Sequence, residues 1–262
     1  MKIKIIAALL SASWVSAPAE AAMMIDATHS ISLGAGIANP AATRAIGENP
    51  AGLVYNMGND LVFFGESESS SLKPLTYVAA LFSGNGMVGT GLTLTRDQGN
   101  SRSLVGFGLA ADARSLGFAI GASGHYRVSG LKVGEDFGAD AGVLFNPMGR
   151  ARLGVTAFDV TQNISALGGG FAYDLSRSAV FVVDATTDKK LKGLAVKPAL
   201  GVSADRITLT YGYGYQVDKA GSTRVIRLNS SVGLGIEFTK DISLEAYYNQ
   251  VAQYYAGLHL KF

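Results

Sequence analysis

The stretch that decides the fold class is the end of the chain, Tyr255-Ala-Gly-Leu-His-Leu-Lys-Phe262. Every second residue is apolar or aromatic, and the positions between them carry Gly257, His259 and Lys261. Alternation with a period of two is the pattern of a β-strand whose two faces differ. A soluble domain more often ends in a polar tail that frays. The stretch therefore predicts a strand that belongs to a sheet up to its last residue.

Three segments upstream repeat this pattern over about ten residues each, the length that a tilted membrane strand needs. In 206–215, 227–238 and 241–249, one face is apolar or aromatic and the other is built from Gly, Ser, Thr and isolated charges. A soluble sandwich also alternates, but its outer face would carry dense Lys and Glu. The pattern favours an all-β fold, a transmembrane antiparallel β-barrel, over a soluble β fold.

Across the whole chain the alternation predicts about fourteen strands, and bacterial barrels have even strand numbers. Tight turns alternate with longer connections, as in outer-membrane barrels, where the short turns lie on the periplasmic side. The short connection before the last strand is the one departure. We expect the barrel to span residues 59–262. The predicted strands are 60–66, 74–83, 86–96, 102–111, 115–128, 135–146, 151–161, 168–175, 178–186, 193–203, 206–216, 224–238, 241–249 and 253–262.

The composition agrees with a membrane barrel and excludes several other classes. Of 262 residues, 48% are hydrophobic and only 16% are charged, which is too apolar for disorder and too poor in charge for a typical soluble surface. The absence of cysteine excludes a disulfide framework, thiolate chemistry and a Cys-based metal site. The net charge of +2 gives no strong attraction to nucleic acid, so we expect no nucleic-acid partner.

No catalytic or metal-binding pattern is found. The three histidines, His29, His125 and His259, lack the spacing of metal ligands, and there is no Gly-x-Ser-x-Gly elbow. Ser243 and His259 fall on inward faces, but inward polar groups of a barrel usually line the lumen. We therefore expect a protein that is not an enzyme and that uses no metal or cofactor.

The first 21 residues resemble a targeting segment. Lys2 and Lys4 precede the apolar run Ile5–Val15, and Ala19-Glu20-Ala21 is a small-x-small cleavage site. A short buried helix or a membrane anchor is the alternative, but the run is too short to span a bilayer. A signal peptide over 1–21 and a barrel together predict the outer membrane of a Gram-negative bacterium.

Residues 22–58 do not alternate, and small side chains dominate them. Pro40 can start a short helix that is capped by Asn39 and ends near Gly47. Asn49-Pro50 then marks a turn before the first strand. By composition alone this is a compact small-residue segment, for example a periplasmic tail.

The motif Asn49-Pro50-Ala51-Gly52-Leu53 follows a Gly/Ala-rich stretch and precedes the first strand. In this position it resembles the long-chain fatty-acid outer-membrane transporter (FadL) family, whose N-terminal hatch carries an Asn-Pro-Ala motif before a fourteen-stranded barrel. The resemblance covers the layout of the mature chain but only residues 31–55 in motif. It implies that residues 22–58 form a hatch that blocks the lumen. It also implies that a hydrophobic ligand, such as a fatty acid or hydrocarbon, passes the hatch and leaves laterally into the membrane.

This chain departs from that family in its loops, which are short and near ordinary connection lengths. The outer docking groove formed by large extracellular loops in longer members is therefore not expected here. The loop cluster Asp188-Lys-Lys190 with Lys192 is either solvated or in contact with anionic surface lipid, such as lipopolysaccharide.

Charged side chains at inward positions are the candidate ligand contacts. A cationic side chain there can pair the carboxylate of an acidic cargo, and it fits a salt bridge across the lumen equally well. The inward candidates are Lys197, Arg227, Glu237, Glu245 and His259.

The last residues also resemble the C-terminal assembly signal of bacterial outer-membrane proteins, through Gly257, Leu260 and Phe262. This implies recognition by the outer-membrane assembly machinery. Phe262 equally fits an aromatic side chain at the membrane interface.

Three functions remain open from the sequence. The first is a passive diffusion channel for hydrophobic small molecules. The second is a structural or interaction barrel without transport, which the short loops favour. The third is a polar-solute pore, which the inward charges favour and a hatch opposes.

Overall fold

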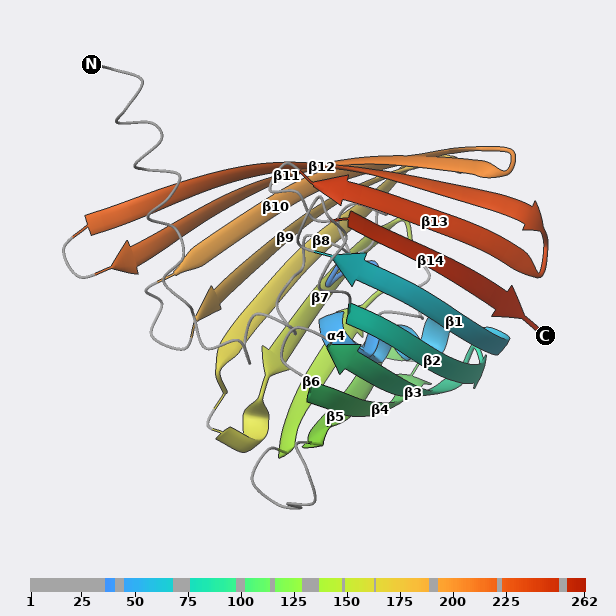
Figure 1. Cartoon of the computed structure of the whole chain (residues 1–262), viewed down its shortest axis with the longest axis horizontal. Coiled ribbons are helices and arrows are strands. Elements are labelled where there is room, and N and C mark those ends of the chain that lie inside the picture. The colour runs from blue at the N-terminus through green and yellow to red at the C-terminus, as the bar shows by residue number, and fades with distance from the viewer. Residues whose placement is uncertain are drawn as a thin grey trace.

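Fourteen antiparallel strands close into one barrel, in which each strand pairs with its neighbours in the chain and β1 pairs with β14 (Figure 1). This confirms the predicted antiparallel β-barrel and the predicted strand number. The computed structural model describes residues 36–40, 45–67, 76–97, 102–113, 116–128, 137–147, 149–162, 164–188, 193–220, 223–249 and 254–262. The predicted signal peptide 1–21, residues 22–35 and 41–44 of the predicted hatch and the basic part of the cluster at 188–192 lie outside the described residues. Within the described residues, no helix is long and apolar enough to cross a bilayer.

Short helices precede the barrel and one follows β7. The helices are α4 Ala45–Glu48, η2 Pro50–Tyr55 and η4 Val160–Gln162. The strands are β1 Met57–Ser67, β2 Thr76–Asn85, β3 Val88–Asp97, β4 Arg102–Ala113, β5 Phe118–Val128, β6 Phe137–Phe145, β7 Ala151–Phe158, β8 Ala166–Ser176, β9 Ala179–Asp188, β10 Leu194–Ala204, β11 Ile207–Ala220, β12 Thr223–Thr239, β13 Ile242–Asn249 and β14 Tyr254–Lys261.

The C-terminal strand closes the barrel. β14 pairs with β1 from Asp60 opposite Lys261 to Ser67 opposite Tyr254. Phe262 continues the pairing, because its amide donates to the Asn59 carbonyl at 3.0 Å and its carbonyl accepts from the Asn59 amide at 3.3 Å. The alternation at the end of the chain therefore reflects a strand that is hydrogen-bonded to its last residue.

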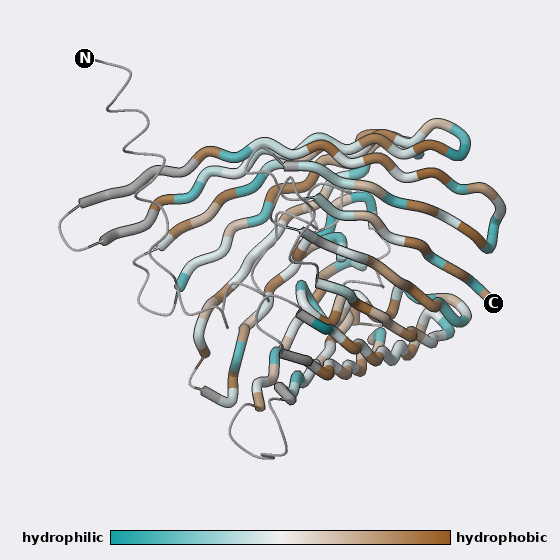
Figure 2. Tube along the Cα trace, in the orientation of Figure 1, coloured by the Kyte–Doolittle hydropathy of each residue, from teal (hydrophilic) through white to brown (hydrophobic). Residues whose placement is uncertain are grey.

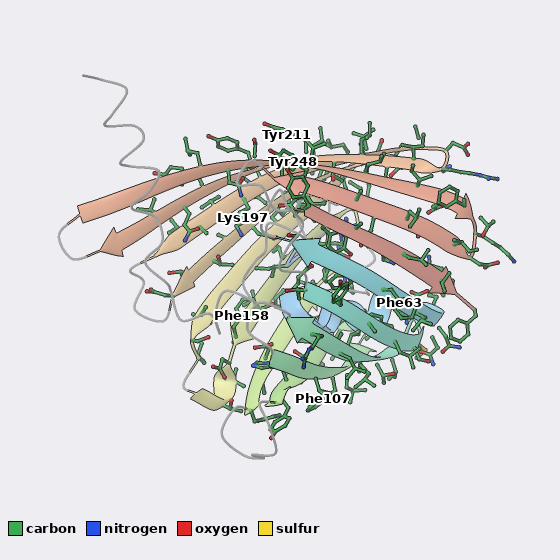
Figure 3. The ribbon with its side chains drawn as sticks, viewed as in Figure 1. Phe63, Phe107, Phe158, Lys197, Tyr211 and Tyr248 are labelled. Carbon is green, nitrogen blue, oxygen red and sulfur yellow. The ribbon has the colours of Figure 1, made fainter. Side chains whose placement is uncertain are left out.

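Unlike a soluble protein, the barrel exposes apolar side chains on its outer surface and buries polar side chains on its inner face. On β7, Leu153 and Val155 are 53% and 49% exposed, whereas Arg152 and Thr156 are buried. Figure 2 shows the same alternation of hydrophobic and less hydrophobic residues along other strands, and Figure 3 shows Phe107 and Tyr211 on the outside of the ring. An apolar outer face over every side of a closed barrel is what a bilayer requires. Other exposed apolar side chains include Phe63, Leu81, Leu92, Leu94, Leu109, Ile120, Phe171, Leu200, Val202, Leu209, Leu228, Val232 and Leu244.

The predicted strands all exist, but some predicted ends are wrong. The loop expected at 217–223 is strand except for 221–222, because Asp218 pairs with Val225 and Lys219 with Arg224. Backbone pairing does not need an apolar face, so the hairpin continues past the apolar part of the pattern. At the other extreme, β7 ends at Phe158 rather than 161, because Asp159 has a φ of 54° and starts a turn.

The start of the barrel also differs. β1 begins at Met57, two residues before the predicted barrel boundary, because a single residue, Asn56, separates it from η2. The predicted helix between Pro40 and Gly47 corresponds to α4, which ends at Glu48; residues 41–44 lie outside the described residues.

Candidate functional site

The described residues before β1, 36–40 and 45–56, are called the inner segment here. Its apolar side chains pack on the inner face of the barrel: Leu53 and Val54 are both 0% exposed and share a cluster with Phe82 of β2 and Leu144 of β6. In Figure 1 the short helices α4 and η2 lie within the ring of strands, behind β1 and β2. The inner segment thus meets the strands with a packed apolar core.

Asn49 is the polar centre of the inner segment. Its side-chain oxygen accepts from the Ala51 amide at 3.1 Å and so caps η2, which has Pro50 at its first turn. Its side-chain nitrogen donates to the Ile37 carbonyl at 2.8 Å and to the Val143 carbonyl of β6 at 3.2 Å. One fully buried amide therefore joins two parts of the inner segment to the barrel wall.

Glycines of the wall let the backbone of the inner segment approach. A Cβ at Gly89 would overlap the Leu53 carbonyl, and one at Gly121 would overlap the backbone between Pro50 and Ala51. A Cβ at Gly142 would likewise overlap the Asn49 side chain. The inner glycines of β3, β5 and β6 are thus the counterpart of the Asn-Pro-Ala motif.

All five motif residues, Asn49 to Leu53, are buried in this contact. Ala51 is 0% exposed, and a Cβ at Gly52 would overlap the ring of Pro40. Small side chains at these two positions let η2 lie between Pro40 and the wall. The motif therefore packs η2 between Pro40 and the barrel wall.

Three further polar contacts join the inner segment to the barrel. The Ile37 amide donates to both carboxylate oxygens of Asp184 on β9, each at 3.1 Å. Ser123 of β5 donates to the Ile46 carbonyl at 2.9 Å. The Tyr55 hydroxyl donates to the Pro147 carbonyl at 2.9 Å, and burial raises the pKa of Tyr55 to about 12.

A second polar cluster lies on β5 and β6 beside the inner segment. Asp140 accepts from the Asp159 amide at 2.8 Å and lies 3.3 Å from the Ser123 hydroxyl. His125 Nδ1 is 3.9 Å from the same carboxylate. Ser123 donates to a backbone carbonyl and contacts the acid directly, so the three side chains do not form the relay of a nucleophilic triad. The cluster orders β5, β6 and the turn after β7.

The predicted lumen residues are not brought together into one site. Lys197 is buried and faces Asp184 across the β9–β10 pair, and its charge acts on that carboxylate. Glu245 of β13 lies 3.0 Å from His259 of β14 and accepts a hydrogen bond from Tyr255. Glu237 is exposed near the end of β12. The side chain of Arg227 lies outside the described residues.

The predicted assembly residues occupy different environments. Gly257 is buried beside Glu245 and Tyr255, and Leu260 is half-buried opposite Ile242. Phe262 is 72% exposed at the end of the chain.

Asp184 and Asp140 are the site residues that the sequence prediction missed. Each is a single acid among apolar or small residues, at an alternate position of its strand: Val180, Val182, Asp184 and Thr186 share one face of β9. Since a lone carboxylate on a face of this kind needs a partner, that position was the signal in the sequence.

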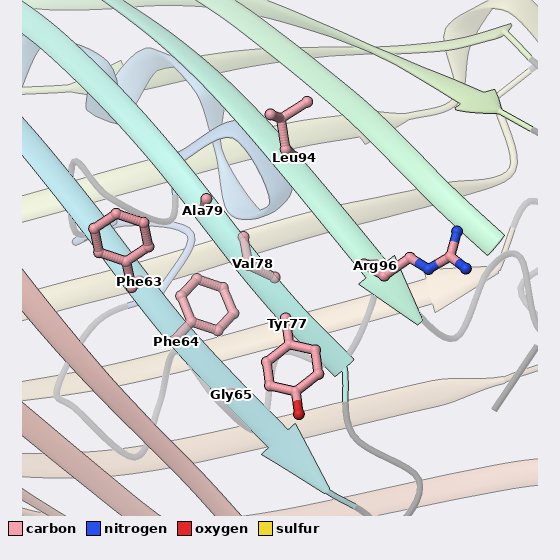
Figure 4. A pocket seen from close by; sticks show the side chains of 8 residues that line it. All are labelled: Phe63, Phe64, Gly65, Tyr77, Val78, Ala79, Leu94 and Arg96. Atoms are coloured by element: carbon pink, nitrogen blue, oxygen red, sulfur yellow. The ribbon is translucent and has the colours of Figure 1, made fainter. Parts of the chain in front are cut away.

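A pocket of about 440 Å³ lies on the outer side of β1–β3 (Figure 4). Phe63, Tyr77 and Leu94 line it and are themselves 45%, 44% and 53% exposed. The β1–β2 and β2–β3 ladders behind it are continuous, so the pocket faces the exterior of a closed wall. The other lining residues are Phe64, Gly65, Val78, Ala79 and Arg96.

These features define a class: a closed fourteen-stranded barrel with a lipid-type outer face and a segment packed on its inner wall. No protein-family model matches the chain, and no curated protein matches it.

Solved structures share the fold. The chain is similar to the CymD monoaromatic hydrocarbon channel, with 11% identity and a TM-score of 0.66 over 89% of this chain and 97% of that one. It is also similar to the Pseudomonas putida toluene transporter TodX, with 11% identity and a TM-score of 0.59 over 88% and 95%. It is similar as well to a Pseudomonas aeruginosa FadL homologue, with 10% identity and a TM-score of 0.58 over 88% of this chain and 96% of that one. At such identities the likeness establishes the barrel fold that the motif resemblance implied.

Proposed function

We propose that this chain is an outer-membrane channel for the passive diffusion of hydrophobic small molecules, with residues 22–58 as its hatch. The apolar outer face supports the membrane location, because such a surface is stable only in lipid. The fold shared with a hydrocarbon channel, a toluene transporter and a FadL homologue supports the class of function.

The observation that carries the proposal is the way the inner segment is attached. Its backbone lies against glycines of one side of the wall, and its polar contacts with the barrel include those of Asn49, Asp184, Ser123 and Tyr55. A segment held in this way opens locally at a lower free-energy cost than a strand of the barrel. A hatch that moves without unfolding the barrel is what passive diffusion requires.

The cargo class follows from the charges of the lumen. Lys197 already faces Asp184, so an acid would have to compete for the cation, whereas a neutral hydrocarbon leaves the pair intact. We therefore propose small hydrocarbons as the first class to test and fatty acids as the second.

The decisive experiment is uptake of labelled toluene, and separately of a labelled fatty acid, by Gram-negative cells that lack their own hydrophobic-compound channels. Cells producing the chain should take up the cargo faster than cells with an empty vector. The double variant Asn49→Ala with Pro50→Ala should lower the rate at an unchanged amount of folded barrel. Equal uptake with and without the chain would refute the channel.

A second function, a structural barrel without transport, is favoured by one observation: Leu53, Val54 and Ala51 are all 0% exposed in the apolar cluster. An inner segment that filled the lumen permanently would be packed in the same way. Native mass spectrometry of the detergent-purified protein separates the two, because a channel should retain a hydrophobic ligand when loaded with one and a filled barrel should not.

Biogenesis is part of the proposal. We propose that Phe262 contributes to recognition by the outer-membrane assembly machinery as well as to closure with Asn59. Deleting Phe262 should slow the appearance of the heat-modifiable folded form in pulse-labelled cells; an unchanged rate would contradict this role.

A further inference from the structure

The pocket on the outer side of β1–β3 is formed by small side chains set among large ones. Two neighbouring rows of outward residues cross the three strands: Gly65, Tyr77 and Arg96 in the first, and Phe63, Ala79 and Leu94 in the second. Each row has one small member, Gly65 or Ala79. A Cβ at Gly65 would meet only the Tyr77 ring, at 3.9 Å, so the space above the glycine is open. The result is a groove of about 440 Å³ with an apolar floor.

Arg96 distinguishes this groove from the rest of the apolar outer face. It is exposed, lies opposite Tyr77 in the β2–β3 ladder, and is the last residue but one of β3. Asp184 and Lys197, by contrast, are buried on the inner faces of their strands. A charged side chain on the lipid face of a barrel is costly at the bilayer midplane and costs little near the interface. Arg96 therefore belongs at the level of the lipid headgroups.

The groove lies in the half of the wall that is remote from the β2–β3 turn. That turn is tight: the amides of Met87 and Val88 both donate to the Asn85 side chain at 2.9 Å. Tight turns of outer-membrane barrels lie on the periplasmic side, and Arg96 is at the opposite end of β3. In Figure 4, Arg96 lies near the end of β3 and Leu94 lies further back on the same strand. The groove therefore faces the outer leaflet, with its cation at the cell-surface end.

This arrangement matches a lipid with an anionic headgroup. The apolar floor and the rings of Phe63 and Tyr77 suit an acyl chain. A guanidinium suits a phosphate, because its planar donors can make two charge-assisted hydrogen bonds to one group. Tyrosine is also enriched at the membrane interface, where its ring is in lipid and its hydroxyl is near water. The outer leaflet of a Gram-negative outer membrane is built from lipopolysaccharide, whose lipid A part carries acyl chains on a phosphorylated sugar.

We propose that the groove outside β1–β3 is a binding site for the lipid A part of lipopolysaccharide. One acyl chain lies over Gly65 and Ala79, and a phosphate of the same molecule pairs with Arg96. The site is separate from the loop cluster at 188–192. It requires the outer membrane but not the channel function, so the failure of one does not decide the other.

Two other occupants fit the groove less well. A cargo molecule from the lumen would have to cross the wall, and both the β1–β2 and the β2–β3 ladders are continuous behind the groove. A second copy of the chain would place Arg96 against an outer face that carries apolar side chains such as Leu200 and Val232, and a charge buried without a partner is costly. Both occupants become outcomes of the test.

The test is a titration of the detergent-purified full chain, followed by native mass spectrometry. The probes are lipid A with both phosphates, lipid A from which the phosphates have been removed, and phosphatidylethanolamine. We expect one molecule of phosphorylated lipid A to bind about tenfold more tightly than either of the other lipids, the ratio that one charge-assisted contact provides.

Two variants and two matched controls assign the binding to the groove. Arg96→Gln should weaken the binding of lipid A about tenfold, and Gly65→Leu with Ala79→Leu should weaken it at least as much by filling the space. Arg206→Gln changes an exposed arginine at the turn between β10 and β11, and Ala246→Leu changes an exposed alanine of β13. Both controls should bind lipid A like the parent. Each protein is first checked for the heat-modifiable folded form, and Arg96→Gln decides alone if the filled variant does not fold.

Four results would overturn the proposal. The parent could bind all three lipids equally, or Arg96→Gln could bind lipid A as the parent does. The spectra could show a dimer without lipid that the filling substitutions abolish, which would identify a second copy as the occupant. Finally, the filled variant could lose uptake of labelled toluene while it keeps its lipid A, which would assign the groove to cargo. Toluene uptake that is absent from the parent as well would refute the channel and leave the lipid A site to be judged by its own titration.

Discussion

Two parts of the barrel wall carry glycine on their inner face, and they differ in what the glycines contact. On β3, β5 and β6, a Cβ at Gly89, Gly121 or Gly142 would overlap atoms of the inner segment. On β11 and β12, a Cβ at Gly214 or Gly235 would meet nothing closer than 3.5 Å and 3.6 Å, respectively. The first part is called the filled wall here and the second the open wall.

The difference shows that one residue type serves two purposes in one barrel. In the filled wall, glycine permits close approach of another backbone, so any side chain displaces the inner segment. In the open wall, glycine leaves space among the described residues, and a small side chain is accommodated. The inner segment packed on the filled wall, beside an open wall, is consistent with the proposed passage of cargo past a hatch.

The largest expected effect is that of a methyl group in the filled wall. Gly89→Ala places a Cβ on the Leu53 carbonyl, and overpacking of this kind costs about 3 kcal/mol. Gly214→Ala in the open wall should change the apparent free energy of unfolding by less than about 0.5 kcal/mol. Guanidinium titration of the detergent-folded barrels measures both. Equal effects would remove the distinction between the two walls.

A smaller effect is expected from the polar centre of the inner segment. Asn49→Ala removes the cap of η2 and the contact with Val143, and should lower the cost of local opening by about 2 kcal/mol, or about thirtyfold in amide exchange of 45–56. Asn229→Ala removes a half-buried amide from the open wall and is the matched control. Exchange in 45–56 that is unaffected by Asn49→Ala would show that other contacts hold the segment.

The smallest effect concerns Tyr55 and pH. Tyr55→Phe removes the bond to the Pro147 carbonyl and should cost about 1 kcal/mol at neutral pH. Because burial raises the pKa of Tyr55 to about 12, the folded state keeps the proton that the unfolded chain loses above pH 10. The stability of the parent relative to Tyr55→Phe should therefore be constant below pH 10 and fall between pH 10 and 12. A constant difference across that range would contradict a buried Tyr55.

The sequence predicted the barrel and all fourteen strands because an apolar outer face and a small or polar inner face repeat at a period of two. It could not predict every end of a strand. The β11–β12 hairpin continues through Asp218 and Lys219, where pairing persists beyond the apolar pattern, and β7 ends early because Asp159 adopts a positive φ.

The site was predictable in part. The motif Asn49–Leu53 was identified through its resemblance to a family motif and its position before the first strand, and the structure describes it as buried. Asp184 was not, because its importance comes from the Ile37 amide, which is 147 positions away in the chain. The two pairs that the β10–β11 ladder lacks at Lys197 and Pro198 were also not predicted, since they depend on which neighbouring strand would receive the amide hydrogen that proline lacks.

The most direct test of the account is the electrical conductance of a barrel without most of the proposed hatch, residues 22–58. A protein lacking residues 22–48 keeps all fourteen strands but loses Ile37 and α4 up to Glu48, and with them most of the contacts of Asp184 and Asn49 to the inner segment. In planar bilayers the folded deletion protein should show raised ion conductance, while the parent stays nearly closed. A folded deletion protein that conducts no more than the parent would contradict the hatch and favour a structural barrel.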